Sequence, residues 1–187
     1  DWETLPYDTF SPHEDIISQR LKTLSRLPHL TKGILILPLS TLLHRVAPKQ
    51  FLQGHSLTLT IGQTFDISSY RRQLESVGYR YVDTVYEHGE FTVRGAIFDV
   101  FPMGSDLPVR IELFDDEIDT LRTFDAETQR SADKVDKIRI LPAQEYPLDK
   151  NGVDHFRINF QDQFDIDFRQ CPLYQDVLKS IPSPVIR

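Results

Sequence analysis

Asp115, Asp116 and Glu117 form a tight acidic run between two segments that we expect to be strands. Carboxylate oxygens are preferred ligands of divalent cations, so the run could hold the metal ion of a phosphoesterase. Carboxylates in a tight turn also accept hydrogen bonds from neighbouring backbone amides, which is a structural role. Because no base, phosphate clamp or second ligand set accompanies the run, we favour the turn and keep the metal-dependent phosphoesterase as an alternative function.

The strand expected over residues 109–114 carries a second group of residues that could act chemically. Side chains alternate between the two faces of a strand, and the aliphatic residues at alternate positions here place one face in the core. Arg110, Glu112 and Phe114 share the other face, which we expect to be the hydrated one. An exposed aromatic residue beside an arginine is typical of a protein–protein hot spot. The pattern therefore indicates a docking surface.

Arg94 lies in a neighbouring strand, directly before Gly95. Glycine in a strand often marks a β-bulge that re-aims the adjacent side chain, so Arg94 could join the same surface. In the alternative interpretation, Phe114 packs beneath a covering helix and Arg94 only pairs with an acidic residue. The pattern alone leaves both interpretations open.

The histidines and the cysteine lack a catalytic arrangement. His13 and Glu14 resemble half of a zinc-protease helix, but Ile17 stands where the second histidine ligand is needed. We therefore interpret this segment as a helix start with acidic residues in its first turn. Cys171 has no histidine near it in the sequence, so we expect a small buried residue rather than a nucleophile.

The glycines limit the chemistry further. The sequence has 8 glycines, and none of them falls in the G-x-x-x-x-G-K-[ST] or G-x-G-x-x-G spacing that cradles phosphates. We therefore predict that this chain has no nucleotide-binding loop, no cofactor and no catalytic set of its own.

The first part of the chain alternates between helix and strand. Ser11 followed by Pro12 predicts a capped helix that runs to about residue 27. The apolar run over residues 33–38 is bounded by glycine and proline and predicts a strand that is buried on both faces. A short helix over residues 40–46 follows. Such an order is typical of a parallel α/β layer, which one strand cannot complete.

The middle of the chain has the pattern of an antiparallel meander with one covering helix. The helix is predicted between Asp66 and Val77, with Gly78 as its stop. Short alternating runs with tight turns between them predict the strands. They lie at residues 56–61, 79–86, 91–101, 109–114, 118–124 and 134–141.

The last part of the chain predicts helices over residues 151–164 and 172–180. The two outer parts look like pieces of one layer that the middle part interrupts. We therefore divide the chain into residues 1–54, which form part of an α/β layer, 55–142, an inserted α+β domain, and 143–187, a mostly helical return to the layer.

The composition excludes several broad classes of protein. The chain has 187 residues, 21 basic and 28 acidic side chains and a net charge of −7, which argues against a broad phosphate-binding surface. One cysteine excludes an internal disulfide framework, and no apolar run approaches the roughly 20 residues that span a bilayer. We see no targeting segment, so we expect a cytoplasmic protein with no membrane partner. The start at Asp1 suggests a processed product or an excised piece.

Two long segments carry a resemblance to known families. They are Glu-Phe-Thr-Val-Arg-Gly-Ala-Ile-Phe-Asp-Val-Phe-Pro at 90–102 and Val-Arg-Ile-Glu-Leu-Phe-Asp-Asp-Glu-Ile at 109–118. Together they resemble a signature shared by two bacterial nucleotide-excision-repair families, the damage-recognition subunit UvrB and the transcription-repair coupling factors (Mfd). The flanking segments at residues 1–8, 10–13, 51–55 and 87–90 resemble the coupling factors more closely.

The resemblance to the coupling factors implies a piece of their amino-terminal, UvrB-like module. In that family an inserted domain (UvrB-like domain 2) docks the UvrA subunit and interrupts a degenerate helicase-like layer (UvrB-like domain 1) without nucleotide chemistry. The partner-contacting positions of the family correspond to Arg94, Arg110 and Phe114, with Glu112 and Asp99 as their neighbours.

The resemblance also implies a larger parent protein. The family resembles ATP-driven DNA translocases that displace stalled RNA polymerase. ATP and Mg²⁺, and the contacts with DNA and RNA polymerase, would belong to other domains of the parent. The rest of the parent would also be an intramolecular partner that masks the docking surface.

A fragment of a UvrB-like damage-recognition helicase is the remaining alternative. UvrB-like proteins carry a long aromatic β-hairpin after their equivalent of Tyr7 and Asp8, which inserts between DNA strands. This sequence passes instead into the helix that Ser11 is expected to cap, and it has no cluster of tyrosines on which bases could stack. We therefore do not expect this chain to separate DNA strands.

Overall fold

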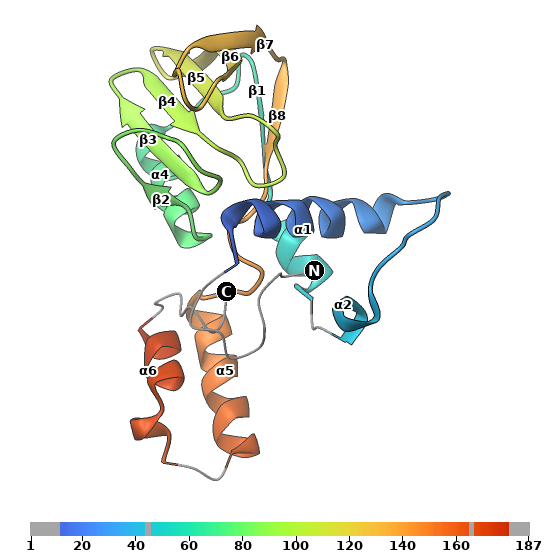
Figure 1. The fold of residues 1–187 in the computed structure, drawn as a ribbon. Coiled ribbons are helices and arrows are strands. Elements are labelled where there is room, and N and C mark those ends of the chain that lie inside the picture. The colour runs from blue at the N-terminus through green and yellow to red at the C-terminus, as the bar shows by residue number, and fades with distance from the viewer. Residues whose placement is uncertain (1–11, 44–45, 165–166, 180–187) are drawn as a thin grey trace.

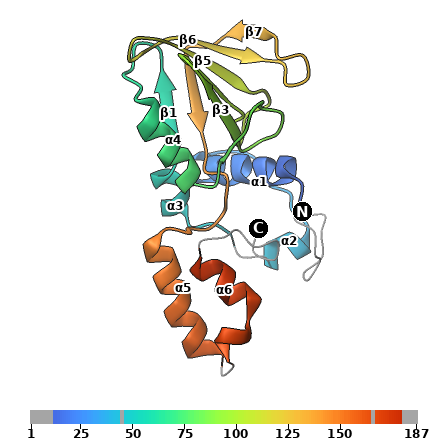
Figure 2. The ribbon, with the colours of Figure 1, turned by 90° about the vertical axis from the view of Figure 1, so that its left-hand side faces the viewer.

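The computed structural model describes residues 12–43, 46–164 and 167–179 as a mixed α/β structure with two sheets. A β-rich part lies at one end, helix α1 crosses below it, and helices α5 and α6 form the other end (Figures 1 and 2). The helices are α1 (Glu14–Arg26), α2 (Leu39–Leu43), α3 (Lys49–Gly54), α4 (Ile67–Ser76), α5 (Lys150–Gln163) and α6 (Pro172–Leu178), with 3-10 turns at Leu27–His29 and Phe168–Gln170. The strands are β1 (Leu57–Thr60), β2 (Arg80–Tyr81), β3 (Glu90–Arg94), β4 (Ile97–Val100), β5 (Val109–Phe114), β6 (Glu117–Phe124), β7 (Ser131–Lys134) and β8 (Lys137–Ile140).

The larger sheet has 6 strands in the order β2-β3-β4-β5-β6-β7, and β1 pairs with β8 in a separate 2-stranded sheet. All neighbours in the larger sheet are antiparallel except β2 and β3. The predicted meander and its covering helix α4 are therefore confirmed. The predicted last strand is confirmed in part, as β8, whereas β7 was not predicted because its residues are all exposed and show no alternation.

The expected single strand over residues 91–101 is wrong, because it is a hairpin made of β3 and β4. Arg94 pairs with Ile97, so Gly95 and Ala96 form a two-residue turn. Gly95 has a φ of 62°, and glycine at the first central position is what a type II′ turn requires. The predicted bulge at Gly95 is therefore a turn. A bulge lies instead in β6, where Asp119 is the extra residue opposite Glu112 and Leu113 of β5.

The strand expected over residues 79–86 is shorter in the structure, where only β2 is a strand. Because β2 and β3 are parallel, the residues between them form a crossover loop instead of continuing the strand. The carboxylate of Glu90 fixes the crossover loop, since it accepts hydrogen bonds from the backbone N–H groups of Tyr86 and Glu87, both at 2.9 Å. Val85 in this loop is fully buried and packs with Phe101 and Phe124.

The main core lies between α4, α1 and one face of the larger sheet. Phe91, Phe98, Ile111 and Leu121 from the sheet are fully buried in it, together with Leu21 of α1. The core therefore joins the β-rich part to α1 across the domain boundary that the sequence predicts near residue 54.

Tyr79 ties the start of β2 to the segment after β8. Its hydroxyl donates to the carbonyl of Leu141 at 2.8 Å and accepts from the N–H of Met103 at 3.0 Å. Burial raises the pKa of Tyr79 well above its ordinary value, and the Met103 bond offsets this in part.

Helix α1 begins at Glu14, and its N-cap is His13, whose side chain accepts from the N–H of Asp15 at 3.4 Å. The predicted cap, Ser11, lies outside the described residues. The apolar stripe of the helix is confirmed, since Ile17 and Leu21 are buried.

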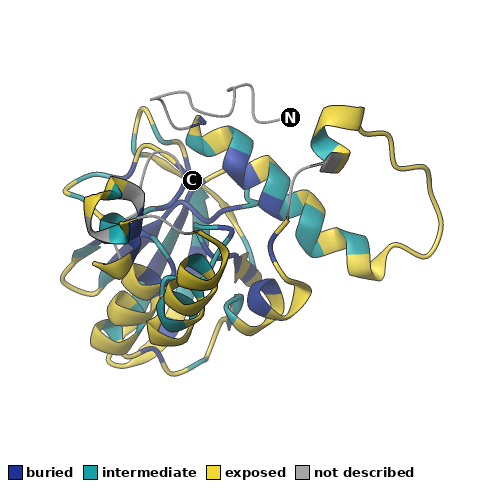
Figure 3. Cartoon of the chain, turned by 90° about the horizontal axis from the view of Figure 1, so that it is seen from below, coloured by how far each residue is buried: buried dark blue, intermediate teal, exposed yellow. Residues whose placement is uncertain are grey.

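The strand that we expected over residues 33–38 is wrong. The segment has no regular secondary structure and no strand pairing, and Ile34 and Ile36 are 89% and 90% exposed. Figure 3 shows this exposed stretch as the long yellow loop between α1 and α2. A buried strand needs neighbouring strands for its backbone hydrogen bonds and packed elements over both of its faces, and the described part of the chain provides neither here.

Helices α2, α5 and α6 lie where the sequence predicts helices, whereas the short helix α3 was not predicted. Phe156 and Phe160 of α5 contact Tyr174 of α6 with ring centroids 5.9 and 5.1 Å apart. Within the described ranges, no helix combines the length and the apolar composition needed to cross a membrane.

Candidate protein-docking surface

The larger sheet has a second face, opposite the main core, on which the predicted docking residues lie. We call it the polar face and define it by Arg94, Asp99, Arg110, Glu112 and Arg122. Strand register places Asp99 opposite Arg110, and Arg110 opposite Arg122. Residues that pair directly across strands share a face, so the register alone brings these side chains together.

Asp99 is the centre of the polar face. Its side chain is only 1% exposed, and it accepts a bidentate pair of bonds from Arg110, with Nε to Oδ1 at 2.8 Å and Nη2 to Oδ2 at 2.9 Å. Nη2 of Arg94 reaches the same Oδ2 at 2.5 Å. Two guanidinium groups thus compensate one buried carboxylate, which would otherwise be costly to desolvate.

Arg110 is held in place on all sides. Its Nη1 donates to the carbonyl of Gln129 at 3.4 Å and to the hydroxyl of Ser131 at 3.2 Å, and its guanidinium lies 4.8 Å from the centre of the Phe124 ring. The hydrogen bonds with Asp99 raise the pKa of Arg110, and burial opposes them in part. The side chain is 13% exposed, so Arg110 presents a small, rigid cationic edge.

Arg94 is the more accessible arginine. Its side chain is 49% exposed and makes a single ion pair, with Asp99, within the described residues. Arg94 therefore pairs with an acidic residue, as in the alternative interpretation, and it also faces solvent, as the docking interpretation expects. The alternative interpretation, in which Phe114 packs beneath a covering helix, is wrong.

Phe114 is 73% exposed at the end of β5. It pairs with Glu117 across the two-residue turn of Asp115 and Asp116, in which Asp115 has a φ of 55°. Covering a large, solvent-exposed apolar side chain on a rigid strand lowers the free energy of the complex with the partner. The acidic run therefore contains the predicted turn, and Phe114 is exposed on the strand that leads into it.

The expectation that the polar face is simply hydrated needs correction. Thr92 and Asp99 are buried on it, and Val85, Phe101 and Phe124 form a small apolar cluster there. The crossover loop and the β6–β7 loop supply this cover, which alternation within one strand could not reveal.

Glu112 and Arg122 complete the face. Glu112 is half-buried and accepts a bond from the hydroxyl of Thr120 at 2.8 Å. Arg122 was missed by the sequence reasoning, although alternation along residues 117–124 places it on the same face as Thr120. The alternation of side chains along β6 is the signal that identifies Arg122.

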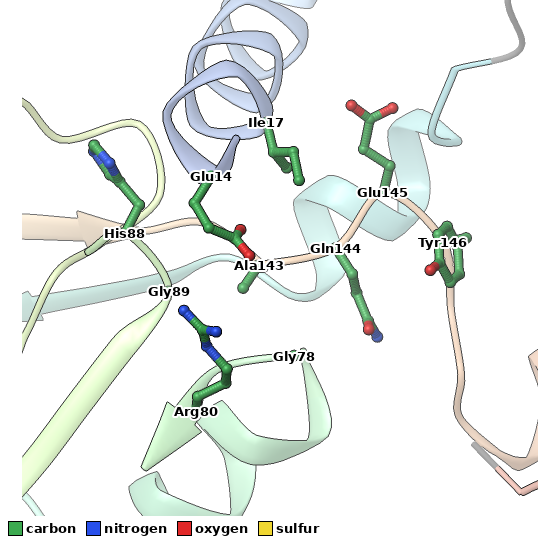
Figure 4. Close-up of a pocket in the computed structure, with 10 residues that line it drawn as sticks. All are labelled: Glu14, Ile17, Gly78, Arg80, His88, Gly89, Ala143, Gln144, Glu145 and Tyr146. Carbon is green, nitrogen blue, oxygen red and sulfur yellow. The ribbon is translucent and has the colours of Figure 1, made fainter. Parts of the chain in front are cut away.

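A pocket lies where α1, β2 and the segment after β8 meet. Figure 4 shows Glu14 and Arg80 extending toward each other from α1 and β2. Glu145 at its rim accepts two bonds from Arg20, at 2.8 and 3.1 Å. His88 contacts a carboxylate oxygen of Asp15 at 2.7 Å through Nδ1. These contacts connect α1 to the loop before β3 and to the segment after β8, so the pocket residues have a structural role.

The other candidate groups do not assemble into a site. Across residues 12–43, 46–164 and 167–179, no group of three or more His, Cys, Asp or Glu could hold a metal ion. The expectation of a buried Cys171 is wrong, since Cys171 is half-buried and precedes α6 as its N-cap residue.

The sequence of this chain matches known proteins over the same region. Residues 57–146 match the family described as the UvrB interaction domain. The chain is 52% identical over 179 residues to the transcription-repair-coupling factor of Escherichia coli K12 and 51% identical over 181 residues to that of Haemophilus influenzae Rd, covering 96% of this chain in both cases. It is 38% identical over 154 residues, or 82% of the chain, to that of Staphylococcus aureus USA300. The chain spans 13–16% of the length of these relatives.

Proposed function

Because the chain carries a UvrB interaction domain and is a homologue of the transcription-repair-coupling factors over nearly its whole length, we propose that it recruits the UvrA subunit to transcription-coupled DNA repair. It does so as a protein-interaction module, and it docks UvrA through Arg94, Arg110 and Phe114. The single observation that supports this most is the 73% exposure of Phe114, which lies in the same strand as the ion-paired Arg110 and within the matched region.

The geometry gives the three residues different roles. Phe114 is the apolar anchor, and Arg94 offers accessible donors to an acceptor on UvrA. Arg110 is mostly satisfied internally, so its role is to fix the surface and to contribute a narrow cationic edge. Asp99 acts through the two arginines, because its buried carboxylate cannot reach a partner.

The wider activity is also proposed. We propose that the parent protein is an ATP-dependent DNA translocase that displaces stalled RNA polymerase in the cytoplasm, and that ATP, Mg²⁺, DNA and polymerase bind outside this sequence. The spacing of the glycines in this chain does not fit a phosphate-binding loop, so no step of that reaction is assigned to its residues.

The exposed segment at residues 33–38 supports the view that this chain is completed by other parts of the parent. Ile34 and Ile36 are exposed apolar side chains in a segment with no neighbouring strand among the described residues. We propose that the remainder of the parent provides the missing layer and masks the docking surface until repair is required.

Binding of purified UvrA to the chain, measured by calorimetry, tests the docking proposal. Loss of a desolvated aromatic anchor costs about 2 kcal/mol or more, so Phe114→Ala is expected to weaken binding by roughly thirtyfold. Leu107→Ala is the matched control, because Leu107 is also exposed but precedes β5 at its opposite end. Equal affinities of the wild type, the Phe114→Ala variant and the Arg94→Ala variant would refute the assignment of the surface.

A further inference from the structure

We infer that Arg122 belongs to the docking surface and that UvrA covers it with an acidic side chain. The inference rests on the proposed UvrA docking and extends it in two respects, the size of the surface and the chemistry of the partner. It is carried by the pairing of β5 with β6, by the hydrogen bonding of Arg122 and by the expected size of the interface.

The first observation is a row of like charges across the sheet. Arg110 faces Arg122 in β6, and Arg122 faces Lys134 in β7. Like charges that are directly opposite each other on neighbouring strands repel. Asp99 compensates Arg110 from β4, but no ion pair within the described ranges includes Arg122 or Lys134. The row is therefore neutralised at one end only.

The second observation concerns Nε of Arg122. This atom is buried and has no hydrogen-bond partner in the described part of the chain, although Arg122 as a whole is half-buried. Native structures leave few buried donors unsatisfied, and a charged donor is the costliest kind. Because Nε itself is buried, a carboxylate of a partner would approach the half-buried guanidinium through its Nη groups.

The third observation is geometric. A standard protein–protein interface buries about 800 Å² on each partner, which corresponds to a patch roughly 30 Å across. Arg122 lies one strand from Arg110, and neighbouring strands are about 4.8 Å apart. A partner that contacts Arg94, Arg110 and Phe114 must therefore also cover Arg122.

These observations leave a single favourable arrangement at Arg122. Covering the guanidinium without an acceptor would desolvate a charge that already lacks one bond, and that would oppose docking. A carboxylate on UvrA would accept hydrogen bonds from the Nη groups of Arg122 and neutralise the unpaired end of the row. Lys134, which is exposed beside Arg122, would strengthen the same attraction.

Arg122→Gln separates this role from a structural one. The substitution removes the charge, so we expect UvrA binding to weaken on the order of tenfold, as for the loss of one charge-assisted hydrogen bond. The melting temperature of the free chain is expected to stay the same or rise, because the variant relieves the repulsion with Arg110. A purely structural role predicts the opposite, a lower melting temperature.

Lys137→Gln is the matched control, since Lys137 is an exposed cation in β8, on the other sheet. We expect its affinity for UvrA to match that of the wild type. A second readout uses the Arg122→Lys variant and carbodiimide, which joins amines to carboxylates, and it is expected to cross-link residue 122 to an Asp or Glu of UvrA.

The outcomes separate the inference from the proposed function. If Phe114→Ala weakens binding while Arg122→Gln binds like the wild type and residue 122 gives no cross-link, UvrA docking stands and the role of Arg122 is overturned. If Phe114→Ala also binds like the wild type, the docking surface itself is wrong. If Arg122→Gln and Lys137→Gln weaken UvrA binding equally, the loss of one positive charge alone would explain the effect, and the inference would also be overturned.

Discussion

The buried carboxylate of Asp99 gives the sharpest stability prediction. Asp99→Asn keeps the size of the side chain and one acceptor oxygen, but it removes the negative charge that faces Arg94 and Arg110. Leaving a buried ion without its partner costs about 3–5 kcal/mol. The variant therefore tests whether the network is the structural centre of the polar face.

The structure reduces that cost in two ways. Arg94 is half-exposed, so water compensates much of its charge and its loss contributes little. Arg110 keeps its bonds to Gln129 and Ser131, although both are longer than those to Asp99. We therefore expect Asp99→Asn to lower the free energy of unfolding by about 2–3 kcal/mol, which is a large part of the roughly 5–15 kcal/mol of a typical domain.

Urea unfolding followed by circular dichroism measures this change as a shift of the midpoint. Asp119→Asn is the control, because Asp119 is an exposed carboxylate in β6 of the same sheet, and we expect a change below about 0.5 kcal/mol. A loss of less than about 0.5 kcal/mol for Asp99→Asn as well would refute the reasoning, because the network would then be no more than a set of weak surface pairs.

Two further predictions concern stability. Gly104→Ala is expected to lower the free energy of unfolding, measured by urea titration, by about 2 kcal/mol or more, because its Cβ would lie 2.8 Å from Leu141 and its φ is +82°. The Cβ of Gly95→Ala would meet nothing within 4 Å, so this control should lose only about 1 kcal/mol through backbone strain. Equal losses in the two variants would contradict the packing argument. Tyr79→Phe is expected to lose about 1–2 kcal/mol at neutral pH, with its two hydrogen bonds. Because burial raises the pKa of Tyr79, the unfolded chain loses the phenol proton first, so wild-type stability falls as the pH rises above the ordinary value of 10.0 and the difference from Tyr79→Phe narrows. A constant difference between pH 8 and 11 would count against this.

The sequence predicted the parts of the fold that depend on local pattern. Alternation over residues 109–114 and the acidic turn after them define β5, its turn and β6. The pattern indicated a hydrated face for Phe114 but left open that it packs beneath a helix, and the structure shows it exposed. Helix α4 followed from its apolar stripe and from Gly78, which has a φ of 95°.

The rest depends on long-range contacts that no single segment encodes. The burial of Asp99 follows from its pairing with Arg110 across strands, and the cover over the polar face comes from Val85, in a loop expected to be a strand. The segment at residues 33–38 has the composition of a buried strand, but its environment among the described residues is solvent. Composition predicts what a segment can bury, and only its neighbours decide whether it does.

Hydroxyl-radical footprinting of the chain with and without saturating UvrA tests the central claim most directly. Phe114 is 73% exposed and is expected to lose most of its reactivity when UvrA is bound. Phe164, at the end of α5, is 51% exposed and serves as an internal reference whose reactivity should not change. Unchanged oxidation of Phe114 in the bound state, or protection of Phe164 in its place, would contradict docking through Phe114 and the two arginines.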